Sequence, residues 1–179
     1  MHIAQIVNQT TIEADRFDLR PVRRSDAGLI ALYAGDVRVA THTPNLPHPA
    51  PPGMVETMIE RWMADDREED AWVIDGSKNN LGEVLGIIAL RRIERAQSEI
   101  TYWIAPGFWN TGLASDAVRE VVAANPHDAR SLFASVFQDN PASARVLTNI
   151  GFQYIGDAEV YSVARTANVA TWTYILQLG

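Results

Sequence analysis

The sequence of 179 residues contains no cysteine. A disulfide framework, a zinc site built on thiolates and a thiol nucleophile are therefore excluded. No stretch approaches the ~20 consecutive apolar residues that a membrane-spanning helix needs. The first residues, 1–10, lack the basic start and long apolar run of a signal peptide. These absences lead us to expect a cytoplasmic protein without a membrane partner.

The sequence has fewer basic than acidic residues. Lys and Arg total 15 against 22 Asp and Glu, which gives a formal net charge of −7. Nucleic-acid phosphates demand basic patches, so no nucleic-acid partner is expected, whereas a cationic substrate is compatible with the balance. The hydrophobic share of 47% is ordinary for a globular protein, and the length suits one domain over residues 1–179.

The pattern along the chain predicts a mixed α/β (α+β) single domain. Its sheet is mostly antiparallel and has about six or seven strands. Strands are predicted where apolar and polar residues alternate or short apolar runs end in turns, at 17–22, 71–75, 84–91, 99–104, 132–136, 152–156 and 168–178. Helices are predicted where apolar residues recur at helical spacing, at 26–34, 54–65, 112–124 and 141–150.

Several conspicuous residues have ordinary interpretations. Ser25 is predicted to cap the first helix, and the proline-rich segment 41–53 is predicted to be irregular. The acidic run 65–70 is interpreted as a solvated helix end, although it would also attract a cationic substrate. Zinc binding is not expected of the loop histidines His42 and His48, which are interpreted as solvated although they could touch a substrate. Trp62, Trp72 and Trp172 are expected in the core.

The segment from Glu99 to Ala124 has the pattern of a strand, a break at Pro106 and Gly107, and a helix. The N-terminus of such a helix exposes free N–H groups and the positive end of the helix dipole, which together form an anion site. Gly112 allows a phosphate to approach the backbone closely. A plain strand-turn-helix without a ligand has the same spacing, so this motif alone leaves both interpretations open.

A second motif follows at 140–151. Asn140 is predicted to be a helix N-cap, with Pro141 at the first helical position, and Gly151 stands where a left-handed C-terminal cap is expected. By itself this motif indicates a well-capped helix and nothing more.

Together the two motifs resemble the GNAT superfamily of N-acetyltransferases, and most closely its ribosomal-protein N-terminal acetyltransferase branch. That branch has a strand reading roughly E-I-G-Y-W-L, then a proline, a tryptophan and G-x-G-x-A. Here 99–104 reads E-I-T-Y-W-I, followed by Pro106, Trp109 and N-T-G-L-A at 110–114. The branch also has N-x-A-S-x-R-V-L and then G-F, which matches 140–147 and 151–152.

The likeness spans nearly the whole chain, because 15–21, 46–49 and 161–165 are also similar to segments of that branch. Two positions depart from its pattern. Asn110 replaces the first glycine of the loop, and Asn tolerates a positive φ better than most residues. Thr101 replaces the strand glycine and adds bulk beside the expected acyl or acceptor pocket.

The resemblance implies that the sheet splays between the fourth and fifth predicted strands, 99–104 and 132–136, and that acetyl-CoA, with no metal, lies in the gap. Backbone groups of Trp103 and Ile104 would bind the pantetheine and the thioester carbonyl, and the loop after them would bind the pyrophosphate. The full set of implied cofactor-binding residues is Trp103, Ile104, Trp109, Asn110, Thr111, Gly112, Leu113, Ala114, Ser115, Asn140 and Ser143.

Catalysis would then be direct acetyl transfer to an amine in a ternary complex, since no cysteine can form an acyl-enzyme and no G-x-S-x-G motif is present. Glu99 is the candidate base, through water, or else a strand-edge carboxylate. Tyr161 is a candidate acid for the thiolate, or else a packing tyrosine. Ser143 is another candidate acid, or else a helix-capping residue.

Two other functions fit the same sequence. One is a non-catalytic acetyl-CoA-binding regulatory domain, and the other is a structural module that shares only the fold. The acceptor is open among a ribosomal-protein N-terminus, an aminoglycoside, a polyamine, an amino acid and an antibiotic peptide. Both a monomer and a homodimer are compatible with the sequence.

Overall fold

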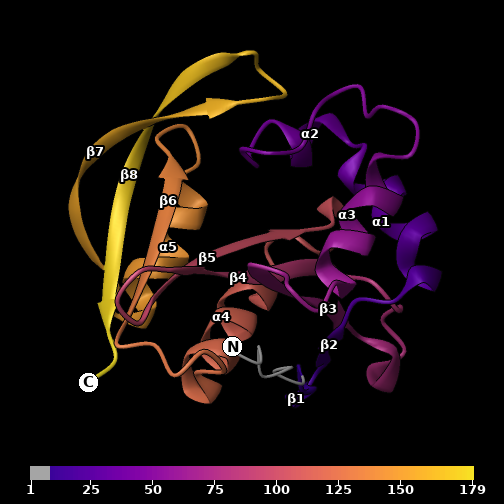
Figure 1. Ribbon diagram of the computed structural model, residues 1–179, viewed down its shortest axis with the longest axis horizontal. Helices are drawn as coiled ribbons and strands as arrows, with labels where there is room; N and C mark the ends of the chain where they lie inside the picture. Colours follow the sequence, from indigo (N-terminus) through magenta and orange to yellow (C-terminus); the bar gives the residue numbers. More distant parts are fainter. Residues whose placement is uncertain (1–8) are drawn as a thin grey trace, which may run out of the picture.

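A computed structural model describes residues 9–179. They form one eight-stranded sheet in the order β1-β2-β3-β4-β5-β6-β8-β7 (Figure 1). Its pairs are antiparallel except for β5 with β6. The strands are β1 (Ile12–Glu13), β2 (Asp18–Pro21), β3 (Glu69–Asp75), β4 (Gly86–Ile93), β5 (Gln97–Ile104), β6 (Ser131–Phe137), β7 (Gln153–Ser162) and β8 (Ala167–Gln177). The predicted mixed α/β fold with a mostly antiparallel sheet is confirmed.

Helices cover both faces of the sheet (Figure 1). On one face α4 and α5 pack against Trp72 and Ile74, and on the other α1, α2 and α3 pack against Ala71 and Val73. β3 is buried on both faces, which explains its continuous apolar run. The described α-helices are α1 (Ala27–Ala34), α2 (Val37–Ala40), α3 (Met54–Met63), α4 (Leu113–Ala124) and α5 (Pro141–Ile150).

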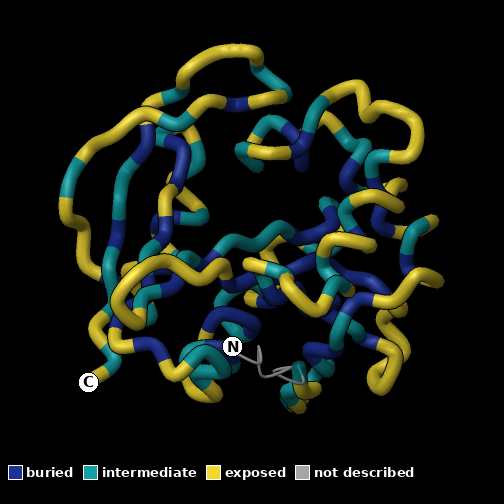
Figure 2. Tube along the Cα trace, viewed as in Figure 1, coloured by how far each residue is buried: buried dark blue, intermediate teal, exposed yellow. Residues whose placement is uncertain are grey.

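Burial falls toward the last two strands. Figure 2 shows the β7–β8 hairpin as largely exposed or half-buried, while the central strands are buried. β7 is the edge strand and continues six residues past Gly156, where the sequence predicted its end. Exposure on both faces removes the alternation that would have marked this extension. Among residues 9–179, no helix is long and apolar enough to cross a bilayer.

The start of the first helix differs from the prediction. Ser25 does not cap it; instead the buried Asp26 carboxylate accepts a hydrogen bond from the Arg23 N–H at 2.8 Å. Asp26 also binds the guanidinium of Arg20 at 2.8 and 2.9 Å, and Asp75 binds the Arg20 Nε at 2.6 Å. A buried arginine requires such partners, so Asp26 is the structural residue here.

The acidic run 65–70 also differs from its predicted role. α3 ends at Met63, and Glu69 and Asp70 already belong to β3. Asp70 is buried, because it accepts hydrogen bonds from Arg67, Arg92 and His127. Arg92 and His127 are distant from Asp70 in the sequence, so the local pattern of charges could not indicate them.

The sequence did not predict α2. This single turn, Val37–Ala40, begins at Asp36, whose carboxylate accepts from the Arg38 N–H at 2.9 Å. Four residues are too few to establish a helical period. α2 matters for function because it places the following residues at the mouth of the cavity described next.

Candidate active site

The sheet opens between β5 and β6. The two strands pair in parallel only where Gln97–Glu99 faces Ser131–Phe133, and they separate beyond Glu99 (Figure 1). β6 stays paired with β8 along its whole length, so β6, β8 and β7 diverge from β5 as one unit. The result is the V-shaped gap that the resemblance implied.

The open side of β5 presents unused backbone groups. The Ala105 N–H donates to the Leu85 carbonyl at 2.8 Å, and antiparallel ladders alternate along a strand. Trp103 and Thr101 therefore bond β4, whereas Tyr102 and Ile104 turn their backbone groups toward the gap. The Ile104 carbonyl already accepts a hydrogen bond from the Trp109 indole at 2.7 Å. Its N–H remains directed into the gap.

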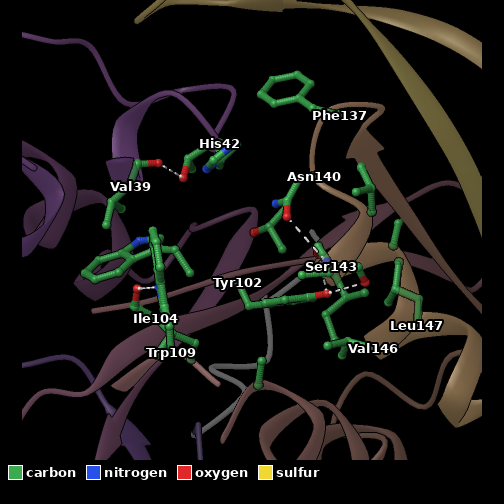
Figure 3. A pocket seen from close by; sticks show the side chains of 18 of the residues that line it. Val39, His42, Tyr102, Ile104, Trp109, Phe137, Asn140, Ser143, Val146 and Leu147 are labelled. Atoms are coloured by element: carbon green, nitrogen blue, oxygen red, sulfur yellow. Dashed lines mark hydrogen bonds between the residues drawn. The ribbon is translucent and has the colours of Figure 1, made fainter. Parts of the chain in front are cut away.

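A cavity of about 980 Å³ fills this gap. This volume lies at the upper end of the range for ligand sites. Its walls come from the α2 region, β5, the loop before α4, β6 and the start of α5 (Figure 3). A cavity of this size, with one long open side, accommodates an extended cofactor and a second substrate.

The loop before α4 forms one end of the cavity. Asn110 has φ 61° and Gly112 has φ 77°, so both lie in the left-handed region. Asn110 thus adopts the positive φ that the sequence comparison anticipated for the glycine it replaces. Arg16 holds the loop from outside, donating to the Thr111 carbonyl at 3.2 Å and to Asp116 at 2.6 Å.

The first turn of α4 points free donors at the same end of the cavity. Its first helical hydrogen bond runs from the Asp116 N–H to the Gly112 carbonyl at 3.1 Å. The N–H groups of Leu113, Ala114 and Ser115 precede that bond and have no partner within the helix. All three residues line the cavity. Together with the helix dipole they form an anion site.

α5 supplies the facing wall. The Asn140 side chain caps the helix by accepting from the Ser143 N–H at 3.4 Å. The Ser143 hydroxyl lies 2.7 Å from the Tyr102 hydroxyl, across the V (Figure 3). Burial raises the pKa of Tyr102 to about 12, although the hydrogen bond with Ser143 acts in the opposite direction. Tyr102 is therefore a neutral hydroxyl at physiological pH.

Two titratable side chains also line the cavity. Glu99 lines the cavity and lies 3.2 Å from the Arg91 guanidinium. His42 lines the cavity from the turn after α2. Tyr161 does not line it, and its side chain is 55% exposed on the edge strand. Of the residues predicted for catalysis, the structure therefore brings together Glu99 and Ser143 but not Tyr161.

All predicted cofactor residues line the same cavity, from Trp103 and Ile104 through the loop to Asn140 and Ser143. Two further residues were missed. Tyr102 could have been noticed, because a hydroxyl on the strand face shared with Ile100 and Ile104 needs a buried partner. Nothing local indicated Arg16, since its partners Thr111 and Asp116 are distant in sequence. His42 was noticed in the sequence, where a solvated side chain was favoured over a contact with the acceptor. Residues 9–179 contain no group of three His, Asp or Glu side chains that could hold a metal ion.

Comparison with known proteins assigns the family. The model of the acetyltransferase (GNAT) domain matches residues 16–153. The chain belongs to the GNAT acetyltransferase family. It is an acyltransferase, and it is 28% identical over 174 residues to YoaA of Bacillus subtilis (strain 168), an uncharacterized N-acetyltransferase; the match covers 86% of this chain and 96% of YoaA.

Solved structures share the fold at low sequence identity. Spermidine N-acetyltransferase from Vibrio cholerae, solved with CoA and spermine, has a TM-score of 0.76 at 15% identity, with 91% of this chain and 96% of that chain covered. RimJ of Mycobacterium smegmatis, solved with CoA-disulfide, has a TM-score of 0.77 at 19% identity, with 99% and 90% covered. At these identities the likeness establishes the fold alone.

Proposed function

We propose that this protein binds acetyl-CoA in the V between β5 and β6 and transfers the acetyl group directly to a primary amine. The proposal rests on one observation: the splayed strands β5 and β6 and the free N-terminus of α4 line the same cavity. An acyl-CoA has a pyrophosphate at one end of a long pantetheine arm, and these features match an anion site joined to an open strand edge.

The cofactor is oriented by backbone groups in this proposal. The N–H groups of Leu113, Ala114 and Ser115 bind the pyrophosphate, and the edge of β5 near Tyr102 and Ile104 binds the pantetheine. An N–H on this edge then donates to the thioester oxygen as negative charge develops there. Asn140 binds the arm from the opposite wall. Trp103 is the exception among the residues predicted to bind the cofactor, because its backbone groups face β4 and only its side chain remains on the cavity wall.

The chemistry requires a neutral amine and a protonated leaving thiolate. Ser143 is placed to donate a proton to the thiolate, with its hydroxyl linked to that of Tyr102. Glu99 is placed to accept a proton through water, with Arg91 orienting its carboxylate. Tyr161 stands outside the cavity, and its position does not support the predicted role as acid.

The acceptor is proposed to be a peptide N-terminus or a small amine, as in the ribosomal-protein acetyltransferase branch. The solved neighbours include enzymes named for different amines, spermidine and the alanine of ribosomal protein S5. The shared fold therefore does not choose between them. The choice lies with the side chains at the mouth of the cavity.

A thiol-release assay tests the proposal. Acetyl-CoA is incubated with a panel containing a polyamine, an aminoglycoside, free amino acids and a peptide with N-terminal alanine. Free CoA thiol is followed together with the acetylated product by mass spectrometry. We expect acetyl-CoA to raise the melting temperature and at least one amine to release CoA. Binding without release for any amine would instead indicate a regulatory domain.

The Ser143→Ala variant tests the acid. We expect a loss in kcat of roughly 10-fold to 100-fold, the lower part of the range for one acid–base group. Thr148→Ala on the same helix is the matched control, because its hydroxyl bonds its own helix at the Arg145 carbonyl. Equal rates for the two variants would remove Ser143 from the mechanism.

A further inference from the structure

His42 faces the cavity from the wall opposite α5. It lies in the turn after α2, and Figure 3 shows it across the pocket from Asn140 and Ser143. The sequence alone left a contact with the acceptor open and favoured a solvated loop histidine. Its neighbour His48, six residues further along the same loop, does not line the cavity. The fold thus separates two histidines that the sequence could not distinguish.

One hydrogen bond determines which ring nitrogen of His42 is available. Nδ1 lies 3.0 Å from the Arg38 carbonyl oxygen. A carbonyl oxygen only accepts, so Nδ1 must carry a proton, and in the neutral ring Nε2 then holds the lone pair. Among residues 9–179 no group makes a hydrogen bond to Nε2. The ring is fixed by one nitrogen and free to accept a proton on the other.

The backbone under His42 is held by the β7–β8 hairpin. Arg165 donates to the Thr41 carbonyl at 2.8 Å, and the Val163 N–H donates to the Pro44 carbonyl at 3.0 Å. Arg165 also binds both oxygens of Asp139, at 2.5 and 3.1 Å. A base must be held in one place to be efficient, and these bonds from a distant hairpin hold the turn.

The charged groups around His42 come from several parts of the fold. Arg38, in α2, is paired with Asp36 at 2.7 Å. Asp139 lies between β6 and α5, within electrostatic reach of His42, and is paired with Arg165. Across the cavity, Glu99 on β5 is paired with Arg91 on β4. Each of these guanidinium groups has a carboxylate partner.

We propose that His42 is a catalytic general base that takes a proton from the acceptor amine. The acceptor enters as an ammonium ion, and its proton passes to Nε2 and later to solvent. The nitrogen lone pair then forms the C–N bond at the thioester carbon as the carbonyl π pair moves to oxygen. When the C=O bond re-forms, the C–S bond breaks and the nitrogen loses its second proton. The departing thiolate takes up a proton from the Ser143 hydroxyl, and the proton lost by the nitrogen restores that hydroxyl.

This inference rests on the proposed acetyl transfer, and it gives the amine end of the cavity a base independent of Glu99. The wall that carries His42 is left for the amine, because in the proposed function the β5 edge and the α4 loop bind the cofactor. Glu99, paired with Arg91, keeps its proposed role and accepts through water the second proton that the amine loses. Replacing His42 should therefore abolish the acidic limb of the pH profile, whereas replacing Glu99 should leave that limb in place.

His42→Gln and His48→Gln form a matched pair for the test. With the best amine found for the wild type, we expect His42→Gln to lower kcat/KM 10-fold to 100-fold and leave the affinity for acetyl-CoA unchanged. Wild-type kcat/KM should fall on the acidic side of the pH profile, because the base must be neutral, and His42→Gln should lose that acidic limb. His48→Gln should behave as wild type.

His42→Ala with added imidazole supplies a second measurement. Recovery of rate by imidazole would support a base, whereas a folding defect would not be rescued. The inference would be overturned if His42→Gln kept the wild-type rate and the acidic limb of the pH profile. It would also be overturned if Glu99→Gln, and not His42→Gln, lost that limb. If the wild type itself released no CoA with any amine, the proposed function would fail first, which is a distinguishable result.

Discussion

The two ends of strand β5 are built in opposite ways. At its start, Gln97–Glu99 pairs with β6, and Ser98 lies in a buried polar network. At its end, Ile100–Ile104 has no strand on that side and borders the cavity. One strand therefore serves both as the closed base and as the open wall of the V. The comparison teaches that an open site in a sheet needs a firmly closed region next to it.

The closed end is held by residues from four separate segments. The Ser98 hydroxyl lies 2.7 Å from His127 Nδ1, and His127 Nε2 lies 2.7 Å from the Asp70 carboxylate. Arg67 and Arg92 donate to the same carboxylate. The arrangement resembles a catalytic triad, but Ser98 is 1% exposed and does not line the cavity, so its role is structural.

Replacing Asp70 should give the largest effect, at the closed end. Asp70→Asn removes a buried carboxylate that binds Arg67, Arg92 and His127, and breaking a buried ionic group typically costs about 3 to 5 kcal/mol. Urea unfolding at neutral pH measures the loss in the free energy of unfolding. Glu60→Gln is the control, because it breaks the exposed pair with Arg24 and should leave stability unchanged. Equal stabilities would mean that the network does not hold the V.

Replacing Gly112 should break the open end and spare the closed one. Gly112→Trp places a bulky side chain at φ 77° beside the free N–H groups of α4. We expect acetyl-CoA affinity to fall by roughly 100-fold or more, about 2.7 kcal/mol, with a smaller loss of stability of about 1 to 2 kcal/mol from the strained φ. Calorimetry of binding and thermal unfolding measure the two quantities separately.

Gly107→Ala is the matched control for the loop, because an added Cβ at Gly107 meets nothing within 4 Å. It should bind acetyl-CoA as the wild type does. Normal binding by Gly112→Trp would contradict the placement of the pyrophosphate at α4.

Acid should weaken the closed end in a defined pH range. Burial acts to raise the pKa of Asp70, but hydrogen bonds from His127 and Arg67 and the charge of Arg92 outweigh it, so the pKa lies at about 2. A carboxyl with a lowered folded-state pKa stabilises the protein above its unfolded value of ~3.9, and this contribution is lost as pH falls toward the folded value. We expect a loss of about 2 kcal/mol between pH ~4 and ~2.

The comparison of wild type with Asp70→Asn isolates this carboxyl. The difference in their free energies of unfolding should shrink as pH falls through that range, since the variant has no carboxyl to titrate at position 70. A difference that stayed constant down to pH ~2 would assign the acid sensitivity to other groups.

Removing the Tyr102 hydroxyl should give the smallest effect, at the open end. Tyr102→Phe deletes the partner of the Ser143 hydroxyl and should lower kcat several-fold while acetyl-CoA affinity stays the same. The loss of stability should be about 1 kcal/mol, typical of one hydrogen bond. Tyr174→Phe is the control, since Tyr174 is buried on β8 and does not line the cavity. Identical kcat values would show that Ser143 acts without Tyr102.

The sequence predicted the elements that carry a repeating pattern or a strong cap. α5 begins and ends where Asn140, Pro141 and Gly151 indicated, and the central strands lie where the apolar runs placed them. The predicted cofactor residues share one cavity because they sit on two regular motifs at the edges of the splay. α2 was missed because four residues are too few to show a helical period, and the second half of β7 was missed because it has no buried face.

Local patterns therefore determined the fold class and the strand-loop-helix at the end of the cavity, since backbone conformation and periodicity are properties of neighbouring residues. The gap between β5 and β6 was implied by the family resemblance. The closed base of the V and the acceptor end of the cavity were decided only by the tertiary structure. Asp70 meets His127, and His42 is held by a turn bonded to Arg165, 124 residues beyond Thr41. Side chains so far apart in the chain come into contact only when the sheet forms, and no local sequence pattern indicates such contacts.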